Sequence, residues 1–259
     1  MDQLNELSGL IAAAEQILVF SGAGISTASG IPDYRGPQGV WKTRRPVYYH
    51  EFMNSEDHRK AYWQQKMEDA ESWGNAGPNE VHRAIVQLEH AGKLEMVVTQ
   101  NVDGLHAVAG TSPEKLVEIH GTNREVECQT CGERSQPEPH FQSFRITGEC
   151  PQCHCGGILK TATISFGQDL RADDMARAIK AADRCDLVVA LGSTLAVNPA
   201  AAVPLYATER GTPYVIINQG ATDHDQLRVV TLRIEGDVAS VFPAAVELAL
   251  GDFEPGAPH

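Results

Sequence analysis

The sequence lacks three features that would place it in whole classes of protein. It has no apolar run of the roughly 18 residues that a membrane-spanning helix needs. It is short of cations, with 21 Lys and Arg against 34 Asp and Glu and a formal net charge of −13. General binding to nucleic acid needs clustered cations, so this balance excludes it. The first residues also lack the basic segment of a signal peptide. We therefore expect a cytoplasmic protein that binds neither membranes nor nucleic acid directly.

Length and composition indicate one large domain that carries insertions. The chain has 259 residues, of which 42% are apolar. This length is less than two domains of about 150 residues each. The apolar share is enough to bury a core, which excludes wholesale disorder. We expect this chain to act as a monomer.

Four short apolar runs rich in β-branched residues indicate buried strands. They lie at 17–20, 96–99, 187–191 and 214–217. Helical apolar stripes precede the second and the third of these runs. Strands that alternate with helices predict an α/β fold with a doubly wound parallel sheet.

Cysteine is concentrated in one short segment, where five of the six cysteines fall between residues 128 and 155. The spacing C-x2-C-x18-C-x2-C is typical of a tetrahedral zinc site with four thiolate ligands, which is closed to water and therefore structural. The predicted ligands are Cys128, Cys131, Cys150 and Cys153. Cys155 could replace Cys153 as the fourth ligand, and His154 is a further candidate.

Two insertions interrupt the alternation of strands and helices. The first is rich in aromatic residues and predicts a loop followed by a helical module, and the second is the zinc-binding module. The expected division is 1–33, 79–121 and 159–250 for the large domain, 34–78 for the loop and helical module, 122–158 for the zinc module and 251–259 for a disordered tail.

The turn after the first strand contains glycines suited to phosphate binding. Gly22-Ala23-Gly24 would let the backbone approach a pyrophosphate, with the amides of the next helix facing the anion. The dinucleotide fingerprint is incomplete, because Thr27 stands where a third glycine is expected. An ordinary strand–turn–helix is the alternative. In the loop beyond, Arg35 could meet a phosphate or a carboxylate, or form a salt bridge within the loop.

Polar residues follow the strand at 96–99, where open α/β sheets bind ligands. Asn101 can donate and accept hydrogen bonds and Asp103 can accept them, although an Asx turn that caps the next helix explains Asp103 as well. His120 ends a further apolar stretch and is a candidate general base, with a structural histidine as the alternative.

Together these motifs resemble one family, the sirtuins, which are NAD-dependent protein-lysine deacylases. The matching segments appear in family order at 22–27, 31–36, 99–106, 119–121, the paired CxxC turns, 165–168, 192–194 and 217–218. The resemblance covers about residues 8–250. It implies a Rossmann-like domain that binds NAD, a smaller domain built from the helical and zinc-ribbon insertions, and a cleft between them for acyl-lysine.

The resemblance also implies roles for particular residues. Those expected to bind NAD are Gly22, Ala23, Gly24, Ser26, Thr27, Asp33, Tyr34, Arg35, Trp41, Gln100, Asn101, Asp103, Gly192, Ser193, Thr194, Asn218, Gln219 and Val238. His120 would be the general base and Asn101 a second catalytic residue. Phe166, Gly167 and Val197 would bind the acyl-lysine peptide by β-augmentation, with 164–167 as the strand. The products would be nicotinamide, free lysine and O-acyl-ADP-ribose.

The resemblance further suggests the acyl class. Members specialised for acidic acyl groups carry Tyr and Arg three residues apart in the helical module, but here Gln65 stands three residues after Tyr62. We therefore expect neutral acyl groups such as acetyl. The segment Gly36–Trp41 resembles a branch with a more fixed cofactor loop, which also accepts longer chains. Alternatives are mono-ADP-ribosyl transfer to protein, a hydride-transferring dehydrogenase and a non-catalytic zinc-stabilised binding module.

Overall fold

The computed structural model describes residues 2–36 and 39–251. In that part of the chain six parallel strands form one sheet, in the order β3-β2-β1-β7-β8-β9. The strands are β1 (Ile17–Ser21), β2 (Leu94–Thr99), β3 (Leu116–Glu118), β7 (Leu187–Leu191), β8 (Tyr214–Asn218) and β9 (Leu232–Glu235). The order reverses between β1 and β7. Their carboxyl ends therefore flank a topological switch point, where open α/β sheets bind ligands.

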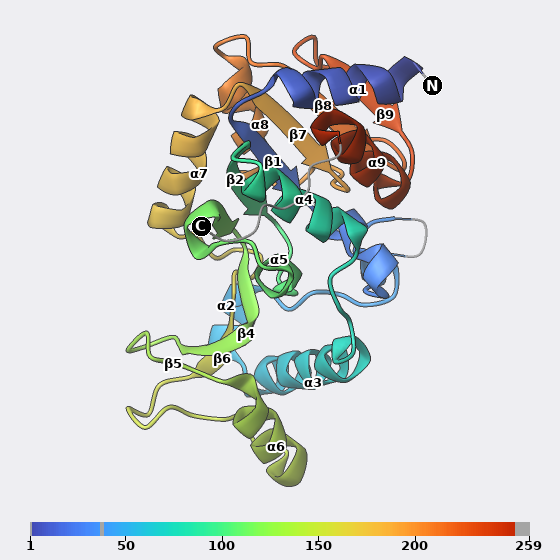
Figure 1. Ribbon diagram of the computed structural model, residues 1–259. Helices are drawn as coiled ribbons and strands as arrows, with labels where there is room; N and C mark the ends of the chain where they lie inside the picture. Colours follow the sequence, from blue (N-terminus) through green and yellow to red (C-terminus); the bar gives the residue numbers. More distant parts are fainter. Residues whose placement is uncertain (1, 37–38, 252–259) are drawn as a thin grey trace, which may run out of the picture.

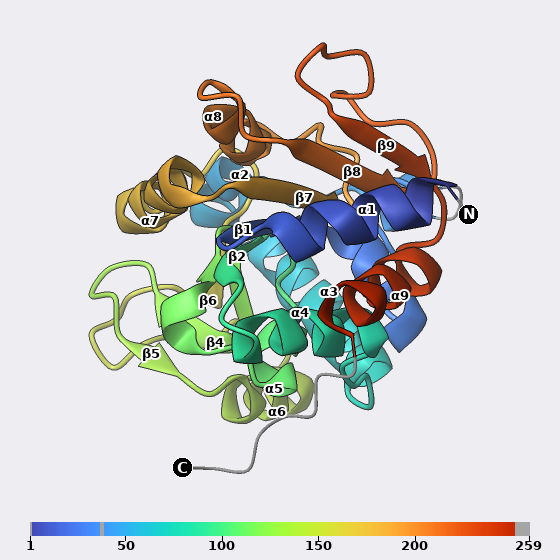
Figure 2. The same cartoon turned by 45° about the horizontal axis from the view of Figure 1, so that its top comes forward.

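Helices cover both faces of this sheet, as Figures 1 and 2 show. One face packs against α1 (Asp2–Ala13), α4 (Glu80–His90) and α9 (Val238–Leu250), and the other against α7 (Ala172–Arg184) and α8 (Val203–Thr208). The short helix α5 (Leu105–Ala109) follows β2. Along β1, Ile17 and Val19 join the first core and Leu18 and Phe20 the second. A strand buried on both faces has no solvent side, which is why its sequence is apolar throughout.

The two insertions form one small domain, in the lower part of Figure 1. It contains an antiparallel sheet with the order β5-β4-β6 and three helices. These elements are α2 (Tyr49–Asn54), α3 (Glu56–Trp73), β4 (Gly121–Cys128), β5 (Arg134–Ser135), α6 (Pro137–Thr147) and β6 (Leu159–Thr163). Trp63 of α3 is fully buried against Phe141 and Phe144 of α6. Segments far apart in the sequence thus share a single core.

The structure confirms the predicted Rossmann-like sheet with a smaller domain, and it corrects several details. Strands β3 and β9, at the two edges of the sheet, lie outside the predicted apolar runs. Residues 159–163 belong to the small sheet, because β6 pairs with β4, so the boundary predicted at 159 falls too early. The tail predicted at 251–259 lies outside the described residues except for Gly251. Within the described residues, no helix has the length and apolar character needed to cross a bilayer.

Candidate active site

A cleft of about 500 Å³ lies between the carboxyl edge of the large sheet and the small domain. It receives residues from the turns after β1, β2, β7 and β8 and from the segment after β6. Predicted residues that line it are Gly22, Ala23, Gly24, Thr27, Asp33, Tyr34, Arg35, Trp41, Gln100, Asn101, His120, Phe166, Gly167, Gly192, Ser193, Thr194, Val197, Asn218, Gln219 and Val238. The remaining two, Ser26 and Asp103, line a small adjoining hollow that also contacts Asn101. The fold therefore gathers residues from across the sequence at one edge.

The glycine turn after β1 packs directly on the turn after β7. The amide of Gly22 donates to Leu191 O and that of Gly24 to Gly192 O, both at 2.9 Å. A Cβ on Gly22 would lie 2.7 Å from Gly192 O, and one on Gly24 would lie 2.8 Å from Gly192 Cα. Gly192 itself has φ +60°, which favours glycine. Close contact between two turns therefore requires glycine here, in addition to any contact with phosphate.

The packing of these turns predicts the effect of adding a methyl group. We expect Gly24→Ala to lower the free energy of unfolding by about 1–3 kcal/mol, because the new Cβ overlaps main-chain atoms that cannot move aside. Gly9, on α1, has open space around its would-be Cβ. There Gly9→Ala should raise stability by up to about 1 kcal/mol through helix propensity. Urea denaturation measures both, and equal stability of Gly24→Ala and wild type would contradict the overlap.

A chain of hydrogen bonds forms the floor of the small hollow. Ser26 Oγ donates to Asp103 Oδ2 at 2.7 Å and accepts from Asn101 Nδ2 at 3.1 Å. Ser26 and Asn101 are buried. The other oxygen of Asp103 accepts from the amide of Leu105 at 2.9 Å, at the start of α5. The Asx turn and the polar floor are therefore both present, made by the two oxygens of one carboxylate.

His120 lies in the turn between β3 and β4 and lines the cleft. Its Nδ1 is 3.2 Å from Gln100 O, and its own carbonyl accepts from the amide of Ile164 at 2.7 Å. A carbonyl oxygen only accepts, so Nδ1 carries the proton in the neutral ring and Nε2 keeps a free lone pair. Burial lowers the pKa of His120, the hydrogen bond to Gln100 opposes this, and nearby Arg35 lowers it further. His120 therefore has the properties of a base that is unprotonated at neutral pH.

Glycine follows His120 for a steric reason. Gly121 has φ +73°, and a Cβ there would lie 2.0 Å from Ala162 O on β6. The close approach lets the chain pass from the large sheet into β4 while Ile164 holds the backbone of His120. The His-Gly pair thus sits where the two domains join.

Aromatic rings connect the loop after β1 to the segment after β6. The ring centres of Tyr34 and Trp41 are 4.9 Å apart, and those of Trp41 and Phe166 are 5.1 Å apart. The Arg35 guanidinium lies 4.2 Å from the centre of the Trp41 ring. Arg35 therefore stacks on Trp41 while it lines the cleft, and this cation–π contact orients its side chain. Pro37 and Gln38 of this loop lie outside the described residues.

The turns after β7 and β8 line one part of the cleft, at residues 192–194 and 218–219, and this part is its far end. Gln100 Nε2 donates to Ser193 Oγ at 2.7 Å, and the same oxygen accepts from the amide of Leu195 at 3.1 Å. Asn218 ends β8 and is buried, and Val238 is the first residue of α9. These groups line the same cleft as Gly24 and His120.

The predicted peptide-binding segment has a different local structure from the expected strand. Strand β6 ends at Thr163, and the amide of Gln168 closes a turn onto Ser165 O at 3.0 Å. The carbonyl of Phe166 accepts from the amide of Tyr49 at 2.9 Å, which anchors the turn to α2. Open space surrounds Gly167, whose φ is +80°. Phe166, Gly167 and Val197 line the cleft, but 164–167 is not a strand in the structure.

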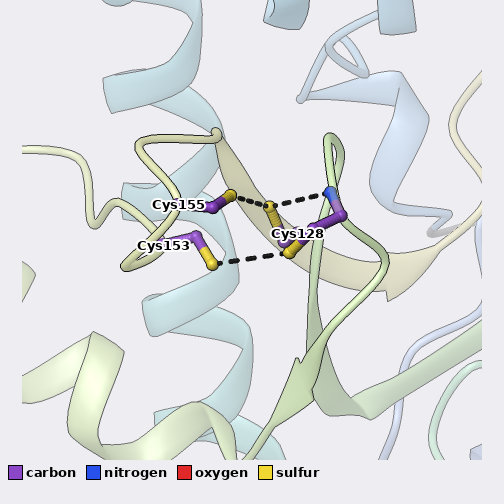
Figure 3. A group of neighbouring side chains, drawn as sticks. Cys128, Cys153 and Cys155 are labelled. Atoms are coloured by element: carbon purple, nitrogen blue, oxygen red, sulfur yellow. Dashed lines mark hydrogen bonds between the residues drawn. The ribbon is translucent and has the colours of Figure 1, made fainter.

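Four cysteine sulfurs converge in the small domain, each within 4.8 Å of the others. They belong to Cys128, Cys131, Cys153 and Cys155. The Sγ atoms of Cys128 and Cys155 are 3.6 Å apart and those of Cys131 and Cys153 are 3.7 Å apart. Zn–S bonds of about 2.3 Å in a tetrahedron hold sulfurs about 3.8 Å apart, so this donor set fits zinc. Figure 3 shows Cys153 and Cys155 directed toward the Cys128 turn.

Comparisons with known proteins agree with this arrangement. The Sir2 family profile matches residues 22–199. The NAD-dependent protein deacetylase of Rhodopseudomonas palustris is 40% identical over 231 residues, which cover 89% of this chain and 91% of that protein. The chain belongs to the Sir2 family.

Solved structures give the same result for the fold. A Sir2 structure with a p53 peptide and NAD+ superposes with a TM-score of 0.83 and 32% identity, covering 94% of this chain and 97% of that one. A Sir2 protein bound to a propionylated peptide gives a TM-score of 0.82 and 30% identity, covering 95% and 97%. The cleft of this Sir2 protein therefore lies on a framework shared with structures that hold a cofactor and a peptide.

The four cysteines that converge in this Sir2 protein differ from the zinc ligands predicted by spacing. Cys150 is outside the group of four, and Cys155 completes it together with Cys153. Cys150 instead packs against the small-domain core, where burial raises the pKa of its thiol. The prediction allowed Cys155 only in place of Cys153, so that part was wrong. The site uses a C-x2-C turn and a C-x-C turn.

The cleft of this Sir2 protein also contains a cation that the sequence comparison missed. Lys66 follows Tyr62 by four residues on α3, so the two lie on one face of the helix. Both line the cleft, and Lys66 Nζ donates to Asn123 Oδ1 at 2.9 Å. Burial lowers the pKa of Lys66 and the nearby carboxylate of Asp69 opposes this effect. A search at i+4 as well as i+3 would have found it.

Proposed function

We propose that this Sir2 protein is an NAD-dependent protein-lysine deacetylase that releases nicotinamide and forms O-acyl-ADP-ribose. The observation that carries the proposal is His120, which lines the cleft and whose Nδ1 lies 3.2 Å from the carbonyl of Gln100, so that Nε2 is the ring nitrogen available as a proton acceptor. The printed names of the relatives, NAD-dependent protein deacetylases, support it. The hydrogen-bonded side chains of Ser26, Asn101 and Asp103 form a second polar site, in the small hollow that adjoins the cleft.

The residues of the chain fit an elongated dinucleotide. The packed turns at Gly24 and Gly192 present bare backbone that could approach phosphates, and Ser193 and Asn218 would hold the adenosine half. The carboxamide of nicotinamide would bind in the small hollow, where Asp103 accepts hydrogen bonds. When bound, NAD supplies an ADP-ribosyl acceptor for the acyl group.

His120 would act on this bound cofactor as a base. Its Nε2 would take a proton from a ribose hydroxyl, and that oxygen would then receive the acyl group. Asn101 would help to orient the groups near the hollow. The edge-to-face rings of Trp41 and Phe166 would cover the acyl-lysine side and limit access of water. Zinc would take no part in the reaction, because four thiolates close its coordination shell.

One incubation tests the proposal against its alternatives. The protein is mixed with NAD and an acetyl-lysine peptide, and the products are identified by mass. Nicotinamide, O-acetyl-ADP-ribose and a peptide with free lysine are expected together. ADP-ribose attached to protein would instead show mono-ADP-ribosyl transfer, reduction of NAD would show a dehydrogenase, and no product would favour a binding module.

We infer that neutral acyl groups are preferred. The Lys66 ammonium already donates to Asn123, and Asp69 also faces this end of the cleft. A succinyl carboxylate would lose its hydration there, and the nearby cations Lys66 and Arg44 already have partners in Asn123 and Asp69. We expect kcat/KM for acetyl- or propionyl-lysine to exceed that for succinyl-lysine by about tenfold or more on matched peptides.

The control for acyl preference is one peptide sequence that carries each acyl group in turn. Formation of the deacylated peptide is measured by mass spectrometry. Lys66→Met should lower succinyl turnover no more than acetyl turnover. Faster removal of succinyl than of acetyl by the wild type would contradict the neutral preference.

We also infer a cytoplasmic location and acyl-lysine proteins or peptides as partners. None of the six cysteines, all of which lie in the described part of the chain, forms a disulfide, as is usual in a reducing compartment. Sir2 structures with peptides support a peptide ligand for the same cleft. The monomeric state and the lack of direct nucleic-acid binding remain predictions.

A further inference from the structure

The Arg233 guanidinium makes five hydrogen bonds next to the far end of the cleft. Arg233 lies on β9 and its side chain is only 19% exposed. It donates from Nε to Asp225 Oδ1 at 2.7 Å, from Nη1 to Asn218 O at 3.1 Å and to Ile234 O, and from Nη2 to Gly220 O at 2.6 Å and Glu235 Oε2 at 2.9 Å. Three of these five acceptors are main-chain carbonyls.

The turn that these contacts hold lies next to the cleft. Asn218 and Gln219 line the cleft, whereas Arg233 lies behind them and is not among the lining residues. Asn218 Nδ2 closes the turn onto Gly220 O at 2.9 Å, and the amide of Gly220 donates to Glu235 Oε1 at 2.8 Å. Arg233 therefore binds the carbonyls of Asn218 and Gly220, and Glu235 binds the amide of Gly220. Together they hold the main chain of the turn.

Asp225 extends the same network to the rest of the loop between β8 and β9. Its carboxylate accepts from the amide of Thr222 at 3.0 Å and from Thr222 Oγ1 at 2.6 Å, in addition to Arg233 Nε. The amide of Asp223 in this loop donates to Thr194 O at 3.0 Å, after β7. The guanidinium thus contacts the turn after β8 directly and is linked to the turn after β7 through the loop that holds Asp223 and Asp225. Both turns line the cleft.

We propose that Arg233 is a positioning residue for the adenosine half of NAD. The inference rests on the proposed function, because it assigns the far end of the cleft to adenosine. The planar guanidinium fork can reach acceptors in several directions at once, whereas an ammonium at the same place is a compact charge on a flexible stem. Arg233 would fix Asn218 and Gln219 before the cofactor arrives, which reduces the ordering cost of binding.

The test compares Arg233→Lys with the same change at an arginine in the loop that precedes β9. Arg228 is exposed, so Arg228→Lys is the control. Isothermal titration with ADP-ribose should show an affinity about tenfold weaker for Arg233→Lys, since one charge-assisted hydrogen bond is worth roughly that factor. Steady-state kinetics should show a similar rise in the KM for NAD. The kcat, the KM for peptide and the inhibition constant of nicotinamide, which would bind at the opposite end, should stay within about twofold.

The outcomes separate the positioning role from its rivals. Unchanged ADP-ribose affinity in Arg233→Lys, with wild-type binding intact, would overturn the role of Arg233 alone. A uniform loss of kcat, peptide binding and nicotinamide inhibition would show a merely structural residue and would also overturn it. Failure of the wild type to bind ADP-ribose would overturn the proposed function and this inference together.

Discussion

His120→Ala is expected to lower kcat by about 10²- to 10⁴-fold, the range for loss of a general base. The affinity for ADP-ribose should stay within about twofold, because the glycine turns and Asn218 remain in place. The loss of kcat is expected because Nδ1 of His120 is used by Gln100 O, which leaves Nε2 as the ring atom that can accept a proton. Single-turnover measurements with NAD and an acetyl-lysine peptide give the rate, and titration gives the affinity.

The dependence of the rate on pH tests the same assignment. Burial lowers the pKa of His120 from the ordinary value of about 6.5. The neutral base therefore persists as pH falls, and the acid limb of kcat/KM should lie below that value. His90→Ala, an exposed residue at the end of α4, is the matched control and should keep wild-type rates. Near wild-type deacetylation by His120→Ala would remove His120 from its role.

Cys155→Ser is expected to lower bound zinc from one ion per chain to well below one and to destabilise the small domain. The Cys155 Sγ lies in the group of four, 3.6 Å from that of Cys128, and a serine hydroxyl is a poor zinc ligand at neutral pH. Structural zinc contributes about 10–16 kcal/mol of binding free energy in small zinc-binding peptides, so its loss is a large effect. Zinc content by mass spectrometry and near-UV circular dichroism measure the two consequences.

Cys150→Ser is the matched control, because this thiol packs on the core and is outside the group of four. It should retain one zinc per chain and lose little stability. The opposite result, with zinc lost from Cys150→Ser and kept in Cys155→Ser, would restore the ligand set predicted from paired CxxC turns. The side-by-side measurement therefore discriminates between the two sets.

The large sheet could be predicted because its strands are buried on both faces. Residues such as Leu18 and Val19 face opposite cores, so the sequence shows a continuous apolar run. The edge strand β3 has three residues, Leu116–Glu118, and contains a glutamate, so it has no such run. Its existence depends on pairing with β2, which is a tertiary contact. Local pattern therefore predicts the central strands better than the edges.

The same limit applies to the zinc ligands. Spacing shows that thiols lie near one another along the chain, but it does not show where the chain turns back. Gly156 has φ +79°, and a Cβ on Gly157 would lie 2.6 Å from Cys128 Sγ. These two glycines let the backbone fold closely over the cluster and bring Cys155 into it. The glycine turn at Gly22–Gly24, by contrast, can be recognised in the sequence because the residues that form it are adjacent along the chain.

Gln100 contributes to the cleft through two different parts of one residue. Its carbonyl contacts His120 Nδ1, and its side-chain amide donates to Ser193 Oγ. Every amino acid has that carbonyl, whereas only a few have the amide. During divergence the side chain at position 100 could change, and recognition of the cofactor would change with it. The main-chain carbonyl would still fix the tautomer of His120. The two properties are thus separable in evolution although they share one residue.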